Sequence, residues 1–266
     1  MEKKSEILNN FKTAISSTVK SLSNSENVVV VFGNQNVKAD SNLIKLPDLE
    51  RVNNKINYKQ VRAIADSESL KLRFSNNKTL KLYEPKGNIS KKLYKVAEKI
   101  RCEKIGSDHF KGIKHNIETY YQERVNSLDL KSSEDKIIES FENYLRIKFL
   151  NSKNNPNLEK KLKTYKKDLD KKFKDKIKQL TNSTQNQASF NSQVSDLISN
   201  MSLDENIEKE EKKDEENNKD DNQKNPENQE QKAEQQKKEE QEMSIESGIP
   251  DLENEASESD QDGEEI

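Results

Sequence analysis

The sequence predicts a mainly helical α+β protein with a small β-hairpin, followed by a disordered acidic tail. Three observations support this prediction: long segments have apolar residues at helical spacing, two short runs have strand character, and the charge changes sign after Leu203. Of the 266 residues, 36% are charged and only 29% are hydrophobic. Globular domains have about 45–50% apolar residues, so this composition excludes a chain that is packed throughout its length.

The division of the chain into a folded domain and a disordered tail rests on charge. Residues 204–266 contain 25 Asp and Glu against 8 Lys, a net charge of −17. The remaining 24 acidic and 39 basic residues give residues 1–203 a net charge of +15. A strongly charged segment with few apolar residues cannot bury enough surface to offset the entropy lost on ordering. We therefore expect a folded domain over 1–203 and a disordered acidic tail or linker over 204–266.

The first elements are a helix and two strands. Apolar residues recur at helical spacing over 4–22. The β-branched run 27–33, which ends at Gly33, predicts a buried strand. Residues 43–46 predict a second strand, which Pro47 stops. Two short strands around one loop suggest a hairpin, and it must pack on helices because an isolated hairpin is barely stable.

The rest of the body is predicted to be helical. One helix covers 57–74, a Pro-Gly turn follows at 83–87, and a second helix covers 89–105. Gly106 is expected to interrupt it before a helix over 107–125. Ser132 and Asp135 have the spacing of a capping box ahead of 134–150. Apolar residues at helical spacing then predict helices over 156–180 and 190–201.

Several kinds of functional site are excluded by the residues available. The single cysteine, Cys102, cannot form an internal disulfide or complete a cysteine-based zinc site. His109 and His115 are six residues apart, so they do not share a helix face as an i,i+4 pair of ligands does. The sequence has no P-loop and no G-x-S-x-G nucleophile motif. We therefore predict no catalytic, cofactor-binding or metal-binding residue in this chain.

The expected location is the cytoplasm. The longest apolar run, Val28–Phe32, is far shorter than the roughly 20 residues that span a bilayer. The first residues are charged and are not followed by the apolar core of a signal peptide. A lone cysteine also suits a reducing compartment.

One group of charged residues stands out on two of the predicted helices. Arg62 and Asp66 form an i,i+4 pair, followed by Ser67, and Glu98 precedes Arg101 by three residues, followed by Glu103. If the two helices pack together, these charges can form a network between them. The alternative is ordinary solvated charges on two helix surfaces, each pair contributing about 0.2–0.5 kcal/mol.

The helix over 158–180 is a second candidate site. It has ten lysines between Lys160 and Lys178, opposite an apolar stripe. Such a face can bind nucleic acid, an anionic membrane surface or an acidic protein, or it can simply be solvated. The acidic tail can also compete with an anionic partner for the basic body. The alternative function is therefore a basic nucleic-acid-binding protein with an autoinhibitory acidic tail.

The order of these segments resembles the T subunit of the aerobic, ATP-dependent cobaltochelatase. The helix 58–72 contains Ala-Asp-Ser and then Leu-Lys-Leu, and Pro85-Lys-Gly87 is similar to the family's Pro-Glu-Gly turn. Residues 97–106 resemble its Glu-x-x-Arg-x-Glu-x-x-Gly helix, and 194–201 lead into an acidic stretch as the family's linker does. The motif positions, expected to form a structural network, are Arg62, Asp66, Ser67, Pro85, Gly87, Glu98, Arg101, Glu103 and Gly106.

The resemblance implies an assembly subunit without catalytic residues of its own. Its partners would be an AAA+ ATPase subunit and a large corrin-binding subunit, in a hetero-oligomer that inserts Co2+ into hydrogenobyrinic acid a,c-diamide during cobalamin (vitamin B12) biosynthesis. The complex would use ATP, Mg2+ and Co2+, none of them bound by this chain. The family's C-terminal von Willebrand A-type domain, with its D-x-S-x-S site, is expected to be absent. Membrane and nucleic acid are not expected partners under this interpretation.

Overall fold

The computed structural model describes residues 2–33, 42–49, 57–130 and 132–201. The chain divides into two units, Met1–Asn222 and Gln223–Ile266, and every described residue belongs to the first. The acidic tail predicted over 204–266 lies outside the described residues. Within the described part, the prediction of a mainly helical protein with two short strands is confirmed.

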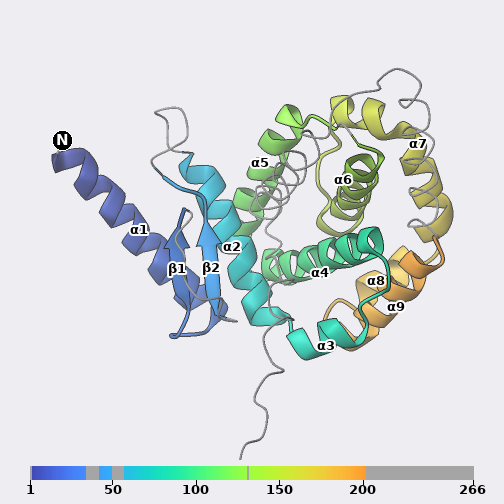
Figure 1. The fold of residues 1–266 in the computed structure, drawn as a ribbon, viewed down its shortest axis with the longest axis horizontal. Helices are drawn as coiled ribbons and strands as arrows, with labels where there is room; N and C mark the ends of the chain where they lie inside the picture. Colours follow the sequence, from blue (N-terminus) through green and yellow to red (C-terminus); the bar gives the residue numbers. More distant parts are fainter. Residues whose placement is uncertain (1, 34–41, 50–56, 131, 202–266) are drawn as a thin grey trace, which may run out of the picture. The chain divides into compact units, whose positions relative to one another are not determined.

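Figure 1 shows the helices and the small sheet that make up the first unit. The elements in chain order are α1 (Glu2–Ser23), β1 (Val29–Phe32), β2 (Leu43–Leu46), α2 (Tyr58–Phe74), α3 (Asn77–Leu82), α4 (Asn88–His109), α5 (Lys111–Ser127), α6 (Ser133–Leu145), the π-helical segment η1 (Arg146–Leu150), α7 (Pro156–Phe173), α8 (Ile177–Asn182) and α9 (Gln187–Ser199).

The two strands lie where the sequence predicts them, but the predicted hairpin is wrong. β1 and β2 are parallel, with Val29 opposite Leu43 and Phe32 opposite Leu46. Hairpin loops usually have two to five residues, whereas parallel strands require a longer connection that returns the chain to the same end of the sheet. Ten residues, 33–42, separate these strands. This connection is longer than a usual hairpin loop, and its length was the available signal against a hairpin.

Apolar contacts hold the sheet against two helices, α1, which precedes it in the chain, and α2, which follows it (Figure 1). This arrangement supplies the support that a pair of short strands needs. We call the buried residues at this junction the sheet cluster. Its members are Ile15, Val19, Val28, Ile44, Leu46, Leu49, Val61, Ile64 and Ala65.

α4 is the central helix of the remaining part. It packs against α2, α5, α6, η1 and α9, and Leu93, Ala97 and Cys102 are fully buried on it. A second apolar cluster joins it to α1, α2 and α5, and we call this the bundle cluster. Its members are Leu22, Leu70, Cys102, Ile113 and Ile117.

The structure corrects the predicted helix break at Gly106. α4 continues through Gly106 to His109, and the break falls at Phe110, which has extended backbone angles. Gly106 lies against the Leu70 side chain of α2, and an added Cβ would be 2.5 Å from Leu70 Cδ1. The glycine is therefore present for close packing of two helices and does not end the helix.

Two further boundaries differ from the prediction, and one helix was not predicted. The helix expected over 134–150 is α-helical only to Leu145 and ends in the π-helical segment η1. The single helix expected over 156–180 is interrupted by turns at 174–176 and divided into α7 and α8. The short helix α3, capped by the side chain of Asn76, was not predicted.

Candidate functional site

The charged residues singled out in the sequence lie on α2 and α4, which pack against each other. The structure distributes them among three sets of polar contacts. The first set belongs to α2 and α5, the second links α4 to α2 and to the segment after α8, and the third joins α2, α4, α5, α6 and η1.

The first set contains Asp66, which is 1% exposed. Arg62 Nε donates to Asp66 Oδ1 at 3.3 Å, and Asn116 Nδ2 of α5 donates to Oδ2 at 2.8 Å. Burial raises the pKa of Asp66, and the hydrogen bonds from Asn116 and Arg62 oppose that rise only in part. Arg62 keeps 44% of its side chain exposed, so this pair lies at the edge of the packed region.

The second set is built around Arg101, which is 1% exposed. Its Nε and Nη2 donate to the two carboxylate oxygens of Glu98, each at 2.8 Å. Its Nη2 and Nη1 also donate to two backbone carbonyls, Phe74 O at 2.5 Å and Thr184 O at 2.9 Å. Arg101 therefore fixes the end of α2 and the segment after α8 to α4. Burial disfavours the charge of Arg101, but the hydrogen bonds to Glu98 and the electrostatic effect of Glu98 and other neighbouring groups together outweigh it and raise the pKa of Arg101.

Cys102 lies beside this pair and is fully buried. Its Sγ is 3.8 Å from Glu98 Oε1 and 3.7 Å from Arg101 Nη2. Burial, together with the Glu98 charge, raises the pKa of the Cys102 thiol well above its ordinary value. The thiol is therefore held in its unreactive, protonated form.

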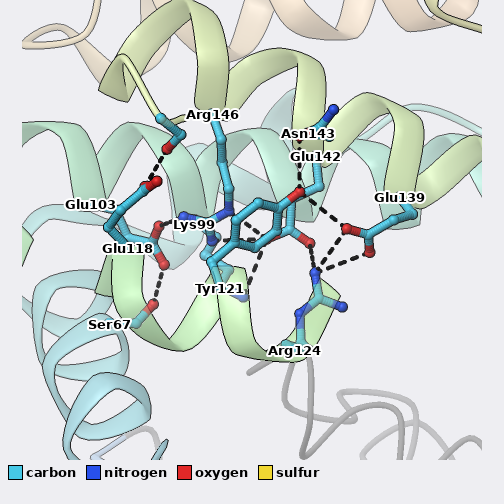
Figure 2. A network of polar contacts seen from close by, with 11 residues as sticks. Ser67, Lys99, Glu103, Glu118, Tyr121, Arg124, Glu139, Glu142, Asn143 and Arg146 are labelled. Atoms are coloured by element: carbon cyan, nitrogen blue, oxygen red, sulfur yellow. Dashed lines mark hydrogen bonds and ion pairs between the residues drawn. The ribbon is translucent and has the colours of Figure 1, made fainter. Parts of the chain in front are cut away.

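The third set is the largest, and we call it the arginine–glutamate cluster (Figure 2). It connects side chains from five elements through hydrogen bonds and ion pairs of 2.6–3.3 Å, apart from one longer ion pair at 4.0 Å. Its members are Ser67, Lys99, Glu103, Tyr121, Arg124, Glu139, Glu142, Asn143 and Arg146.

One half of this cluster is organised by Arg146, the first residue of the π-helical segment. Arg146 Nη1 donates to Glu103 Oε2 of α4 at 2.8 Å, and its Nε donates to Glu142 Oε1 at 2.8 Å. The other oxygen of Glu103 accepts a hydrogen bond from Ser67 Oγ of α2 at 2.6 Å. One arginine and one glutamate thus link three elements that are distant in sequence.

The other half is organised by Arg124 of α5. Its Nη2 lies 3.0 Å from Glu139 Oε2 and 3.1 Å from Glu142 Oε2. The hydroxyl of Tyr121 donates toward Glu139 Oε1 at 3.1 Å and lies 3.3 Å from Asn143 Oδ1. The Tyr121 ring lies between two guanidinium groups, with Arg146 4.5 Å and Arg124 5.3 Å from its centroid (Figure 2).

The charges of the cluster balance. Three carboxylates, Glu103, Glu139 and Glu142, face three cations, Arg124, Arg146 and Lys99, whose Nζ is 4.0 Å from Glu142. Removing one partner from a buried pair of this kind typically costs about 3–5 kcal/mol, because the other charge is left uncompensated. The cluster therefore ties α4, α5 and α6 together by mutual neutralisation.

Two carboxylates of the cluster have pKa values shifted in opposite directions. Burial raises the pKa of Glu139, against the opposing effect of Arg124. Burial alone would also raise the pKa of Glu142, but Arg124, Arg146 and Lys99 outweigh it and hold the pKa well below its ordinary value. Opposed pKa values can mark an acid–base pair. Here both carboxylates are 4% exposed and bonded to arginine, an arrangement that holds helices together.

The remaining motif residues have backbone roles. Pro85 is buried, and Gly87, with a φ of 96°, precedes the first turn of α4. This φ lies in the region that glycine adopts without strain. Together with Gly106 against Leu70, these residues set where α4 begins and how closely it approaches α2.

Sequence reasoning missed most of the arginine–glutamate cluster. Glu139, Glu142 and Arg146 lie at i, i+3 and i+7 on the helix predicted over 134–150, next to its apolar stripe. Charged residues next to the apolar stripe of a strongly amphipathic helix were the sequence signal that could have predicted these buried ion pairs. Among the described residues, no group of three or more His, Cys, Asp or Glu side chains is placed to hold a metal ion. Likewise, none of the described helices has the length and apolar character to cross a membrane.

Comparison with known protein families shows the family to which the chain belongs. The family model described as cobalamin biosynthesis protein CobT matches residues 5–266. The chain belongs to this CobT family. The match includes all three sets of polar contacts, as well as the acidic residues after Leu203. No solved structure matches the chain.

Proposed function

We propose that this chain is an assembly subunit of an ATP-dependent cobaltochelatase, with no catalytic residue of its own. The reaction would insert Co2+ into hydrogenobyrinic acid a,c-diamide during cobalamin biosynthesis in the cytoplasm. Its partners would be an AAA+ ATPase subunit and a large corrin-binding subunit. ATP, Mg2+ and Co2+ would then be substrates and cofactors of the complex. The observation that carries this proposal is the CobT family match over residues 5–266.

The polar contacts of the first unit are consistent with a scaffold. The buried carboxylates Glu98, Glu103, Glu139 and Glu142 are each bonded to arginine. Such groups stabilise the relative positions of the helices that carry them. We propose that Arg62, Asp66, Ser67, Pro85, Gly87, Glu98, Arg101, Glu103 and Gly106 serve the fold of the subunit, and that they act on the reaction only through the shape they maintain.

The proposal is tested by reconstitution with the two partner subunits. The full chain, the AAA+ subunit and the large subunit are incubated with ATP, Mg2+, Co2+ and hydrogenobyrinic acid a,c-diamide, and the cobalt-containing product is measured by mass. We expect product only when all three proteins and ATP are present. Product formed at the same rate without this chain would contradict the proposal.

A binding experiment separates assembly from catalysis. The chain and the AAA+ subunit are passed together through a size-exclusion column with ATP and Mg2+, and again without nucleotide. We expect the two proteins to elute as one complex with nucleotide. Separate elution under both conditions, with the chain shown to be folded by circular dichroism, would rule out the assembly role with this ATPase.

A further inference from the structure

The solvent-facing side of α7 has a regular row of lysines. Positions i, i+3, i+7, i+11 and i+14 of the helix and its cap are lysine, and every one of them is exposed. We call this row the lysine stripe. Its members are Lys160, Lys163, Lys167, Lys171 and Lys174. At 1.5 Å per residue, the stripe is about 21 Å long.

The opposite side of the same helix is fixed in the core. Leu158, Leu162, Leu169 and Phe173 are at most 4% exposed, and α7 packs against α5 and α6. In Figure 1, α7 is at the edge of the ribbon, beyond α6. The lysine stripe is therefore held in one orientation on a packed helix, which keeps its five charges aligned on a single face.

Several other charged side chains on α7 have partners in the structure. Lys166 pairs with Glu159 at 2.6 Å, and Asp170 pairs with Lys148 at 3.8 Å. Lys172 Nζ lies 3.4 Å from the carbonyl oxygen of Met201. Among the side chains that the structure describes, no carboxylate pairs with a stripe lysine. Five like charges in a row repel one another, so an anionic partner gains from all of them.

We propose that the lysine stripe is a docking surface for an acidic polypeptide segment of a partner protein. Lysine presents compact point charges, which suit flexible Asp and Glu side chains. Bidentate binding of phosphate favours the planar guanidinium of arginine, and stacking on bases favours exposed aromatic rings. α7 has no arginine, and of its two aromatic residues Phe173 is fully buried and Tyr165 is half-buried. Binding in a lipid interface requires a free apolar face, whereas the apolar face of α7 is packed inside the protein.

The proposal stands apart from the chelatase function and is tested with a defined probe. Fluorescently labelled poly-L-glutamate is titrated with the full chain at about 50 mM salt, and binding is followed by anisotropy. The stripe variant is K163E/K167E/K171E. The matched control, K78E/K81E/K114E, reverses the same number of exposed lysines on α3 and α5. A third variant, K163Q/K167Q/K171Q, removes the charge without adding repulsion.

We expect the stripe variant to bind poly-glutamate at least tenfold more weakly than the wild type, the glutamine variant to show an intermediate loss, and the control to change less than about twofold. Equal weakening in the stripe and control variants would overturn the proposal, because binding would then follow net charge alone. Duplex DNA or phosphatidylserine vesicles that bind through the stripe more tightly than poly-glutamate would also overturn it. Circular dichroism and thermal melting confirm that each variant is folded.

Discussion

At position 106, the size of one side chain decides how closely two helices approach. Leu70, which is fully buried, fills the space where a Cβ on residue 106 would lie. Both methyl groups of Leu70 would be too close to that atom, and Leu70 has no solvent to move into. The sequence alone marked Gly106 as a helix break, because a glycine within a helical pattern usually weakens it.

The substitution Gly106→Ala tests this packing. We expect it to lower the free energy of unfolding by about 1–3 kcal/mol, the usual cost of overfilling a packed core. Gly112→Ala is the control, since nothing lies within 4 Å of the added Cβ in the first turn of α5. It should leave stability unchanged or raise it by up to about 1 kcal/mol. Both are measured by urea unfolding, and equal effects would contradict the packing argument.

At the residue scale, the sequence predicts contacts within a helix better than contacts between helices. Arg62–Asp66 and Glu98–Arg101 follow from i,i+4 and i,i+3 spacing, and both pairs form. Ser67–Glu103 and Glu103–Arg146 join residues 36 and 43 positions apart. Such contacts depend on how α2, α4 and η1 pack, which spacing along one chain segment does not specify.

At the scale of elements, α6 shows how local sequence fixes a helix start. Ser132 accepts a hydrogen bond from the backbone N–H of Asp135, and the Asp135 carboxylate accepts one from the backbone N–H of Ser132. This capping box was predicted from the spacing of the two residues and is confirmed. It sets the beginning of the helix that carries Glu139 and Glu142 into the arginine–glutamate cluster.

Removing the cap should therefore weaken the helix. We expect Ser132→Ala to lower the free energy of unfolding by about 1 kcal/mol, the typical effect of losing an N-cap side chain. Ser133→Ala changes the neighbouring residue, which is not the cap, and should stay within about 0.5 kcal/mol of the wild type. Chemical denaturation of the two variants side by side measures the difference. A larger loss in Ser133→Ala would show that the cap does not hold the start of α6.

The element boundaries that the sequence mispredicted have physical causes of the same kind. The apolar spacing of residues 156–180 continues across the turns at 174–176, so periodicity alone reads one helix where α7 and α8 are separate. The strands were found as short apolar runs, rich in β-branched residues in β1, but such runs do not indicate whether two strands pair in parallel or antiparallel. The spacing of apolar residues shows which side of an element is buried. It does not show where the chain turns or in which direction two strands pair.

For the whole molecule, the arginine–glutamate cluster makes stability depend on pH. The pKa of Glu142 is lower in the folded protein than its ordinary value of 4.5. A depressed carboxyl pKa contributes stability that is present above the unfolded pKa and is lost as the pH falls through the folded pKa. The pKa of Glu139 is raised, so its contribution has the opposite sign.

The variants Glu142→Gln and Glu139→Gln separate these contributions. At pH 7 we expect Glu142→Gln to be less stable than the wild type, with the difference shrinking as the pH falls below about 4.5. Relative to Glu139→Gln, the wild type should instead gain stability as the pH falls toward 4.5. Urea unfolding at a series of pH values between 7 and 3 gives both differences. A wild-type advantage over Glu142→Gln that is constant with pH would contradict the assigned shift.

The position of α2 has a consequence for how this unit loses its structure. Val61, Ile64 and Ala65 belong to the sheet cluster, while Leu70 belongs to the bundle cluster. The helix α2 therefore contributes buried residues to both clusters. Opening either cluster removes the apolar contacts that hold α2 in place for the other. The parallel strands and the helices around α4 are therefore not separate folding units. They are expected to form and to melt cooperatively, in one transition.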